Sequence, residues 1–151
     1  MRYRLAALIC KSCLALLAGF PVYGQAAESS PIASGGAACV IAKKLGDSLD
    51  IAWATGAGSV SDAISQAKQE LRKRGYPDLF PQANSDQPHG WMVIVKTGYR
   101  NARGRPRTSY GCGFNTRSAT AAEQDAVDNL RSYSWGWRPD FGYQVIEKTS
   151  Y

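Results

Sequence analysis

The sequence predicts an α+β fold with one mostly antiparallel sheet and two helices on one face of it. Two observations lead to this class: short β-branched segments recur along the chain, and two segments with helical apolar spacing lie between them. The predicted order is β-β-α-β-β-α-β, which without its first strand is the order of ferredoxin-like folds. In such a fold each helix buries its apolar stripe against the sheet.

The strand predictions depend on a four-residue pattern that occurs three times. Residues 40–43, 93–96 and 145–148 read VIAK, VIVK and VIEK, at intervals of 53 and 52 residues. Residues 49–53 and 110–114 alternate bulky with small or polar side chains, which is the period of a strand. We therefore predict two copies of one unit, residues 38–90 and 91–148.

The helix predictions depend on caps and apolar stripes. Ser59 is a suitable N-cap for a first helix, and Gly75 ends it. A second helix begins after Ser118 or at Thr120. Alignment of Leu71 with Leu130 pairs Ala63 with Ala122 and Ala67 with Ala126. The predicted apolar stripes are Val60, Ala63, Ile64, Ala67 and Leu71 in the first helix and Ala119, Ala122, Ala126, Leu130 and Tyr133 in the second.

The N-terminal segment has the features of an export signal. Arg2 and Arg4 precede a short apolar run at residues 14–20, and Ala26 offers a small residue for cleavage. The run is too short to span a bilayer, although an uncleaved anchor is an alternative. We expect a signal peptide at 1–26, a disordered leader at 27–37 and a single domain at 38–151, located in the periplasm or outside the cell without a stable membrane anchor.

Cleavage of this signal changes the cysteine count and the charge. Cys10 and Cys13 leave with the signal, so their C-x-x-C spacing predicts no redox or metal function. Cys39 and Cys112 remain, and an isolated pair in an oxidising compartment predicts a disulfide. The net charge falls from +6 to +3, which weakens the case for nucleic acid as a partner.

The strand, small-residue turn, serine and helix that recur over residues 38–148, with alanines at helical spacing, resemble a group of small exported bacterial proteins of unknown function. The resemblance implies export and an α+β domain, and it implies no activity. Many members of that group carry paired cysteines that this chain lacks.

No residue pattern predicts catalysis, a cofactor or a metal site. The one histidine, His89, lies in a predicted turn, whereas a zinc site needs three or four ligands. Aspartates at predicted turns have local structural roles. A carboxylate-dependent hydrolase stays as an alternative, with Asp47, Asp50, Asp78 and Asp140 as its candidate acids.

Two segments have compositions that a structural role alone does not explain, and we take them as candidate binding sites. Residues 99–107 (YRNARGRPR) form a predicted loop with four arginines and no acid, and arginine pairs with carboxylates and phosphates. Residues 133–138 (YSWGWR) are rich in aromatic side chains, which stack on sugars or anchor interfaces. Of the two tryptophans there, we expect Trp135 to be the more buried. The candidate binding residues are Tyr99, Arg100, Arg103, Arg105, Arg107, Trp135 and Trp137.

These observations predict an exported, non-catalytic binding protein. The leading hypothesis is an inhibitor or immunity-type protein that binds another protein through the arginine loop, where charge complementarity speeds encounter. The alternatives are a protein that binds a cell-envelope polymer, such as peptidoglycan, lipopolysaccharide or another polyanion, and the hydrolase described above. Nucleic acid is not an expected partner, because export separates the protein from it.

Overall fold

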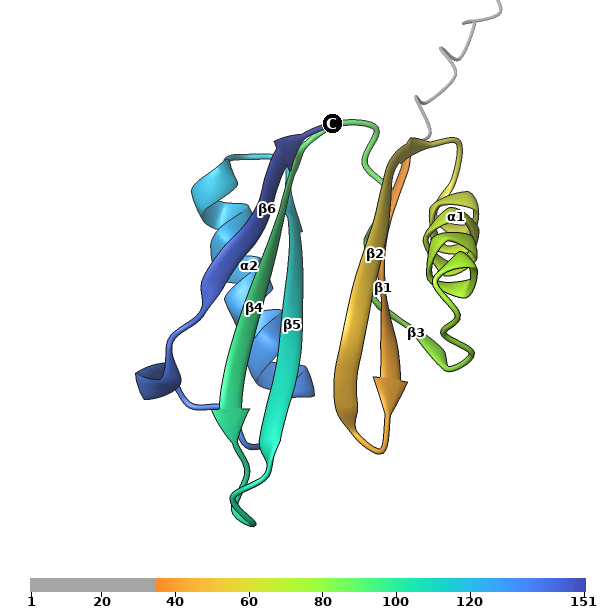
Figure 1. The fold of residues 1–151 in the computed structure, drawn as a ribbon. Coiled ribbons are helices and arrows are strands. Elements are labelled where there is room, and N and C mark those ends of the chain that lie inside the picture. Colours follow the sequence, from red (N-terminus) through yellow and green to blue (C-terminus); the bar gives the residue numbers. More distant parts are fainter. Residues whose placement is uncertain (1–34) are drawn as a thin grey trace, which may run out of the picture. The chain divides into compact units, whose positions relative to one another are not determined.

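A computed structural model describes residues 35–151, so the predicted signal and most of the predicted leader lie outside the described residues. Each half of this part contains a β-hairpin, a helix and a further strand (Figure 1). In chain order the elements are β1 (Gly36–Lys44), β2 (Asp47–Ala57), α1 (Val60–Lys73), β3 (Leu79–Ser85), β4 (Trp91–Arg100), β5 (Pro106–Asn115), α2 (Ala119–Tyr133), a 3-10 helix (Pro139–Phe141) and β6 (Gln144–Ser150).

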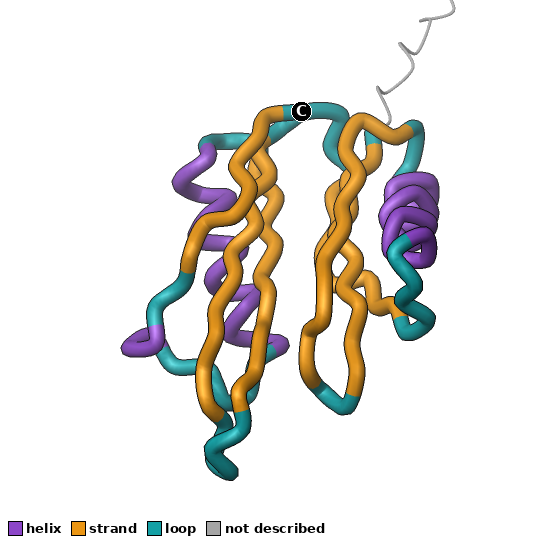
Figure 2. The backbone as a smooth tube through the Cα atoms, viewed as in Figure 1, coloured by secondary structure: helices purple, strands orange, loops and turns teal. Residues whose placement is uncertain are grey.

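The strands form two antiparallel three-stranded sheets. The first sheet has the order β2-β1-β3, and the second has the order β5-β4-β6. Helix α1 packs on the first sheet and α2 on the second, each on the face away from the other sheet (Figures 1 and 2). The predicted α+β class is confirmed, whereas the single sheet with both helices on one face is wrong.

Burial of both faces of the central strands explains the two sheets. In β1, Val40 packs toward α1, whereas Cys39 and Ile41 pack toward the second sheet. In β4, Val93 packs toward α2 and Ile94 toward the first sheet. A single sheet with helices on one face would leave the isoleucines in water, and burial of each such side chain is worth about 1.5–3 kcal/mol.

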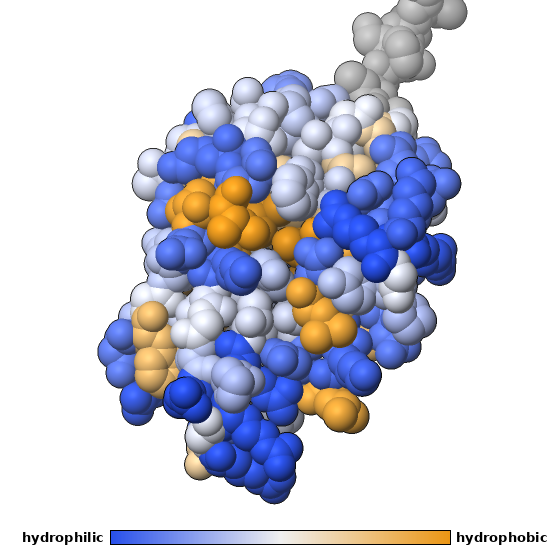
Figure 3. All heavy atoms as spheres, viewed as in Figure 1, coloured by the Kyte–Doolittle hydropathy of each residue, from blue (hydrophilic) through white to orange (hydrophobic). Residues whose placement is uncertain are grey.

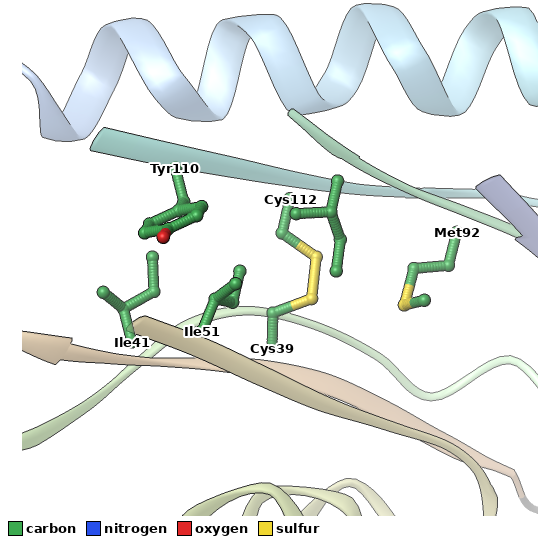
Figure 4. Close-up of a cluster of buried hydrophobic side chains, with 7 residues drawn as sticks. Cys39, Ile41, Ile51, Met92, Tyr110 and Cys112 are labelled. Atoms are coloured by element: carbon green, nitrogen blue, oxygen red, sulfur yellow. A yellow bond between two sulfur atoms is a disulfide. The ribbon is translucent and has the colours of Figure 1, made fainter. Parts of the chain in front are cut away.

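The predicted disulfide between Cys39 and Cys112 is present and joins β1 to β5 across the core between the sheets (Figure 4). The two Cα atoms are 6.5 Å apart, and both residues are buried. Figure 4 shows the bond between Met92 on one side and the two isoleucines, Ile41 and Ile51, on the other. The bond therefore links the two halves of the chain inside their shared core.

Strand β3 is an element that the sequence did not predict. It is an edge strand that contains Pro81, and proline is tolerated there because one side of the strand is unpaired. The buried Gln82 donates from Nε2 to the carbonyl oxygen of Tyr110 at 2.6 Å and to Oδ1 of Asn129 at 2.8 Å. Asn129 Oδ1 also accepts from the backbone N–H of Cys112. These side chains satisfy backbone groups on the open edge of β5.

Helix α1 begins after its predicted cap, Ser59, and α2 begins after Ser118, one of the two starts predicted for it. Ser59 Oγ accepts from the N–H of Asp62, and Ser118 Oγ accepts from the N–H of Ala121, each at 3.1 Å. Within residues 35–151 no helix is long and apolar enough to cross a membrane. The buried residues of the helices occupy equivalent positions, which are Ala63, Ala67 and Leu71 in α1 and Ala122, Ala126 and Leu130 in α2.

The start of the domain and the position of the third β-branched segment differ from the predictions. Strand β1 begins at Gly36, so the last two residues of the expected leader belong to the sheet, where Ala37 is buried. The third β-branched segment, residues 145–148, lies in the edge strand β6, whereas the first two lie in the central strands β1 and β4. The third segment therefore corresponds in position to β3 rather than to the strand that opens each half.

Candidate binding site

The predicted arginine loop is the turn between β4 and β5, which projects from one end of the second sheet (Figure 1). Figure 3 shows a strongly hydrophilic surface at this end. Arg100, Arg103 and Arg105 are exposed, and Arg107 is half-buried. Within the described residues none of the four forms a salt bridge with a carboxylate. Their positive charge is therefore free to act on a partner.

Asn101 holds this turn in one conformation. Its Oδ1 accepts from the backbone N–H groups of Arg103 and Arg105, both at 3.0 Å. The N–H of Gly104 donates to the carbonyl oxygen of Asn101, and Gly104 has φ of 71°, which glycine adopts without strain. Arg100 Nη1 donates to the carbonyl oxygen of Gly104 at 2.8 Å. The arginines are thus presented from an ordered turn.

Tyr99 and Trp137 support the base of the loop. Trp137 packs with Val93 against α2, and its Nε1 donates to the carbonyl oxygen of Gly142 at 3.2 Å. The ring of Tyr99 stacks on Phe141 with a centroid distance of 5.8 Å. Their contacts lie within the chain, so these two candidate residues have a structural part in the site.

The expectation that Trp135 is more buried than Trp137 is wrong. Trp135 is 99% exposed, and Trp137 is 7% exposed. Helix α2 ends at Tyr133, so helical spacing no longer decides which of the following side chains faces the core. Trp137 has a partner for its indole N–H inside the chain, whereas Trp135 projects into solvent beside the arginine loop.

A hollow of about 270 Å³ brings together three segments that are far apart in the sequence. They are the turn between β1 and β2, the arginine loop and the residues that follow α2. Arg107 Nη1 donates to the carbonyl oxygen of Leu45 at 3.2 Å, which links the first two segments. The hollow is lined by Leu45, Gly46, Tyr99, Asn101, Arg107, Tyr133, Ser134, Trp135 and Gly136.

Sequence reasoning missed Leu45 and Ser134 in this site. Leu45 is 89% exposed at the tip of a turn and has φ of 51°, an unusual conformation for a residue with a side chain. The sequence signal for an exposed Leu45 was its position directly before Gly46 in a two-residue turn. Ser134 follows the helix and resembles an ordinary cap, so no sequence signal indicated that it lines the hollow.

Lys43 adds a positive charge near the hollow. Its ammonium group lies 5.1 Å from the ring centroid of Tyr133 and 5.8 Å from that of Phe80. Burial lowers the pKa of Lys43 from its ordinary value, while the aromatic faces stabilise the cation. Tyr133 and Phe80 therefore both make cation–π contacts with Lys43.

Three of the four carboxylates considered for hydrolysis have structural partners. Asp47 accepts from the N–H of Thr108, Asp50 accepts from Arg74, and Asp140 accepts from Arg138. In the part of the chain that the structure describes, no three histidine, cysteine or acidic side chains lie close enough to hold a metal ion together. Asp78 and His89 are exposed.

No protein-family model, curated protein or solved structure matches this chain. The function therefore has to be inferred from the geometry and charge of the site itself. The arginine loop, Trp135 and Leu45 are the exposed groups that this geometry brings to one end of the second sheet and its neighbouring turn.

Proposed function

We propose that this chain is an exported, non-catalytic protein that binds another protein through the arginine loop, as an inhibitor or immunity-type protein. The observation that carries the proposal is the ordered turn that presents Arg100, Arg103 and Arg105 without carboxylate partners in the described residues. An acidic surface on the partner would meet this charge, which steers association.

Exposed apolar groups beside the loop support a protein partner. Trp135 is 99% exposed, Leu45 is 89% exposed and Tyr133 is 52% exposed, and all three line one hollow. Clustered exposed apolar groups mark interaction sites, and tryptophan, tyrosine and arginine are the residues that dominate binding energy at interfaces. The ordered turn also reduces the entropy that binding would otherwise lose.

Export is part of the proposal, with cleavage after Ala26 and a location in the periplasm or outside the cell. A disulfide is compatible with an oxidising location, and this one lies in the core between the sheets. We also propose that the two halves arose by duplication of one unit. The equivalent caps at Ser59 and Ser118 and the equivalent buried positions in α1 and α2 support this origin.

The test uses capture of partners from an envelope fraction by the tagged full chain, exported by the cell that makes it. We expect the double variant Arg103→Glu/Arg105→Glu to lose the captured protein, because it reverses the charge of the loop. The matched control is Lys68→Glu/Arg72→Glu, which makes the same change of charge on α1, the helix of the first sheet.

Two results would contradict the proposal. One is equal capture by the loop variant and by the control. The other is capture of purified peptidoglycan or lipopolysaccharide in place of a protein, with loss of binding as salt rises, because salt screens contacts between exposed charges. The second result would assign the loop to an envelope polymer.

A further inference from the structure

Two side chains close the outer edge of β2. This strand lies at the edge of the first sheet, and within residues 35–151 no strand pairs with its outer side. The backbone N–H of Ile51 donates to Oδ1 of Asp50 at 2.8 Å, and the carbonyl oxygen of Ile51 accepts from Nη1 of Arg74 at 3.3 Å. Arg74 Nη1 also donates to Oδ2 of Asp50 at 3.1 Å. Asp50 and Arg74, the edge pair, therefore bind the backbone groups that a further strand would use.

The edge strand of the second sheet has a cap in the same place, but that cap is buried. In β5 the carbonyl oxygen of Tyr110 accepts from the buried Gln82 of β3. Ile51 precedes Leu71 of α1 by the same number of residues as Tyr110 precedes Leu130 of α2, so the two capped positions correspond. The side chains of the edge pair are 40% and 27% exposed. The cap of β5 thus belongs to the interior, whereas the cap of β2 lies where another chain can replace it.

The regular part of β2 can pair with itself. Between the two register shifts in its pairing with β1, β2 runs regularly from Asp50 to Ala54. Two such stretches that run antiparallel about Ala52 place Ile51 of each copy opposite Trp53 of the other. Outward backbone groups alternate along a strand, so those of Trp53 point the same way as those of Ile51. Each of these two pairs can exchange two hydrogen bonds.

The side chains of this stretch suit the same register. Trp53 is 37% exposed, and it lies two residues after Ile51, so it projects from the same face of β2. In the paired arrangement the indole lies beside Ile51 of the second copy, and aromatic side chains stabilise a sheet when they lie opposite β-branched ones. Ala52 lies on the two-fold axis, where the close approach of a non-hydrogen-bonded pair favours a small residue.

We infer that the outer edge of β2 is an interface for a second copy of this chain, and that Asp50 and Arg74 control access to it. With the edge pair in place, the backbone groups of Ile51 are occupied and the edge stays single. Without it, the β2 strands of two copies pair and join their first sheets into one. Such a contact uses the same surface on both copies and closes as a two-fold dimer. It goes beyond the proposed function and does not involve the arginine loop.

The test measures the mass of the full exported chain by light scattering after gel filtration, from micromolar to millimolar concentration. The double variant Asp50→Ala/Arg74→Ala should double its mass as concentration rises, whereas the wild type should stay a monomer. Asp50→Ala alone keeps the arginine beside the carbonyl oxygen, so it should dimerise more weakly. The matched control is Arg138→Ala/Asp140→Ala, which removes an ion pair with the same 3.1 Å distance from the second half of the chain. It should stay a monomer.

Two further measurements identify β2 as the contact. Addition of Trp53→Lys to the double variant should restore the monomer, because a lysine on an edge strand opposes pairing. The backbone N–H of Trp53 should exchange with solvent more slowly in the dimer than in the monomer, because only a second copy gives it a partner. Thermal unfolding of the double variant should stay cooperative, because ion pairs between exposed side chains contribute little to stability.

Three results would overturn the inference. They are a double variant that stays a monomer at every concentration, a dimer that survives Trp53→Lys, and a dimer in which the N–H of Trp53 exchanges as fast as in the monomer. If the double variant does not unfold cooperatively, the same criteria applied to Asp50→Ala decide the question. Capture of a partner through the arginine loop should be equal for the double variant and the wild type, so the two proposals can fail separately.

Discussion

Replacement of Cys39 and Cys112 by alanine should destabilise the protein by about 4 kcal/mol. The bond closes a loop of 73 residues, and the loop-entropy relation gives about 4.4 kcal/mol for this length at 25 °C. Both side chains lie in the core between the sheets, so their loss also removes packing contacts there. The effect should therefore be large in spite of the conservative change in size.

Urea unfolding of the exported chain measures this effect. For a urea dependence of about 1.5–2 kcal/mol per molar, the midpoint should fall by about 2–3 M. The matched control is the wild-type chain unfolded with and without a thiol reductant, because reduction removes the bond and keeps both sulfur atoms. The difference between the reduced chain and the alanine variant then reports the packing contribution alone.

A change in midpoint below about 0.5 M would refute this reasoning. It would mean that the contacts of Gln82 with Asn129 and with the backbone of β5 hold the two halves together without the bond. A second result would also contradict it. Because both sulfur atoms are buried, reduction of the folded protein should be no faster than its unfolding, and rapid reduction without unfolding would show that the core is open.

Two further predictions concern packing and ionisation. Gly111→Ala should cost about 2–3 kcal/mol, because its Cβ would lie 2.0 Å from the carbonyl oxygen of Ala126 in α2. Gly98→Ala, whose Cβ would have 3.9 Å to its nearest neighbour, should be neutral in the same thermal unfolding assay. Burial, with a smaller effect of Asp50, raises the pKa of Tyr110 above its ordinary value. The uncharged phenol therefore contributes fully to the free energy of unfolding below about pH 10, and this contribution is lost as pH rises through the raised pKa. Tyr110→Phe cannot ionise, so in urea titrations above about pH 10 it should retain more of its stability than the wild type does.

The sequence was sufficient for features that depend on local chemistry. The cap at Ser59 and the small buried residues of α1 and α2 follow from helix geometry, and the structure has them where they were expected. For α2 the sequence allowed Ser118 or Thr120 as the start, and the structure has Ser118 as the cap. The disulfide followed from the predicted compartment and from the number of cysteines. These features need no knowledge of which strands are neighbours.

The number of sheets could not be predicted in the same way, although a signal was present. A contact between Cys39 and Cys112 fits two strands in one sheet as well as two strands in facing sheets. The continuous apolar runs of β1 and β4 were the better indicator, because a strand with water on one face alternates between apolar and polar residues. Strand β3 was missed because Pro81 interrupts a short segment that pairs with the sheet on one side only.

The arginine loop could be located from the sequence, but the hollow beside it could not. The hollow needs Leu45, Arg107 and Ser134, which belong to three segments that only the packing of the two sheets brings together. The difference in exposure between Trp135 and Trp137 could not be predicted from the sequence either. Their exposure depends on where α2 ends and on which carbonyl group is near the indole, and neither follows from aromatic composition.

The two hairpins of the fold provide an internal test of whether the arginine loop is needed for folding. The turn between β1 and β2 joins its strands with two residues, Leu45 and Gly46, whereas residues 101–105 join β4 to β5. The longer turn contributes no residue to the hydrophobic clusters of the described part, and its neighbouring guanidinium groups repel one another. A hairpin can therefore be closed in this fold without these residues, which agrees with the proposal that the loop binds a partner and is not needed for stability.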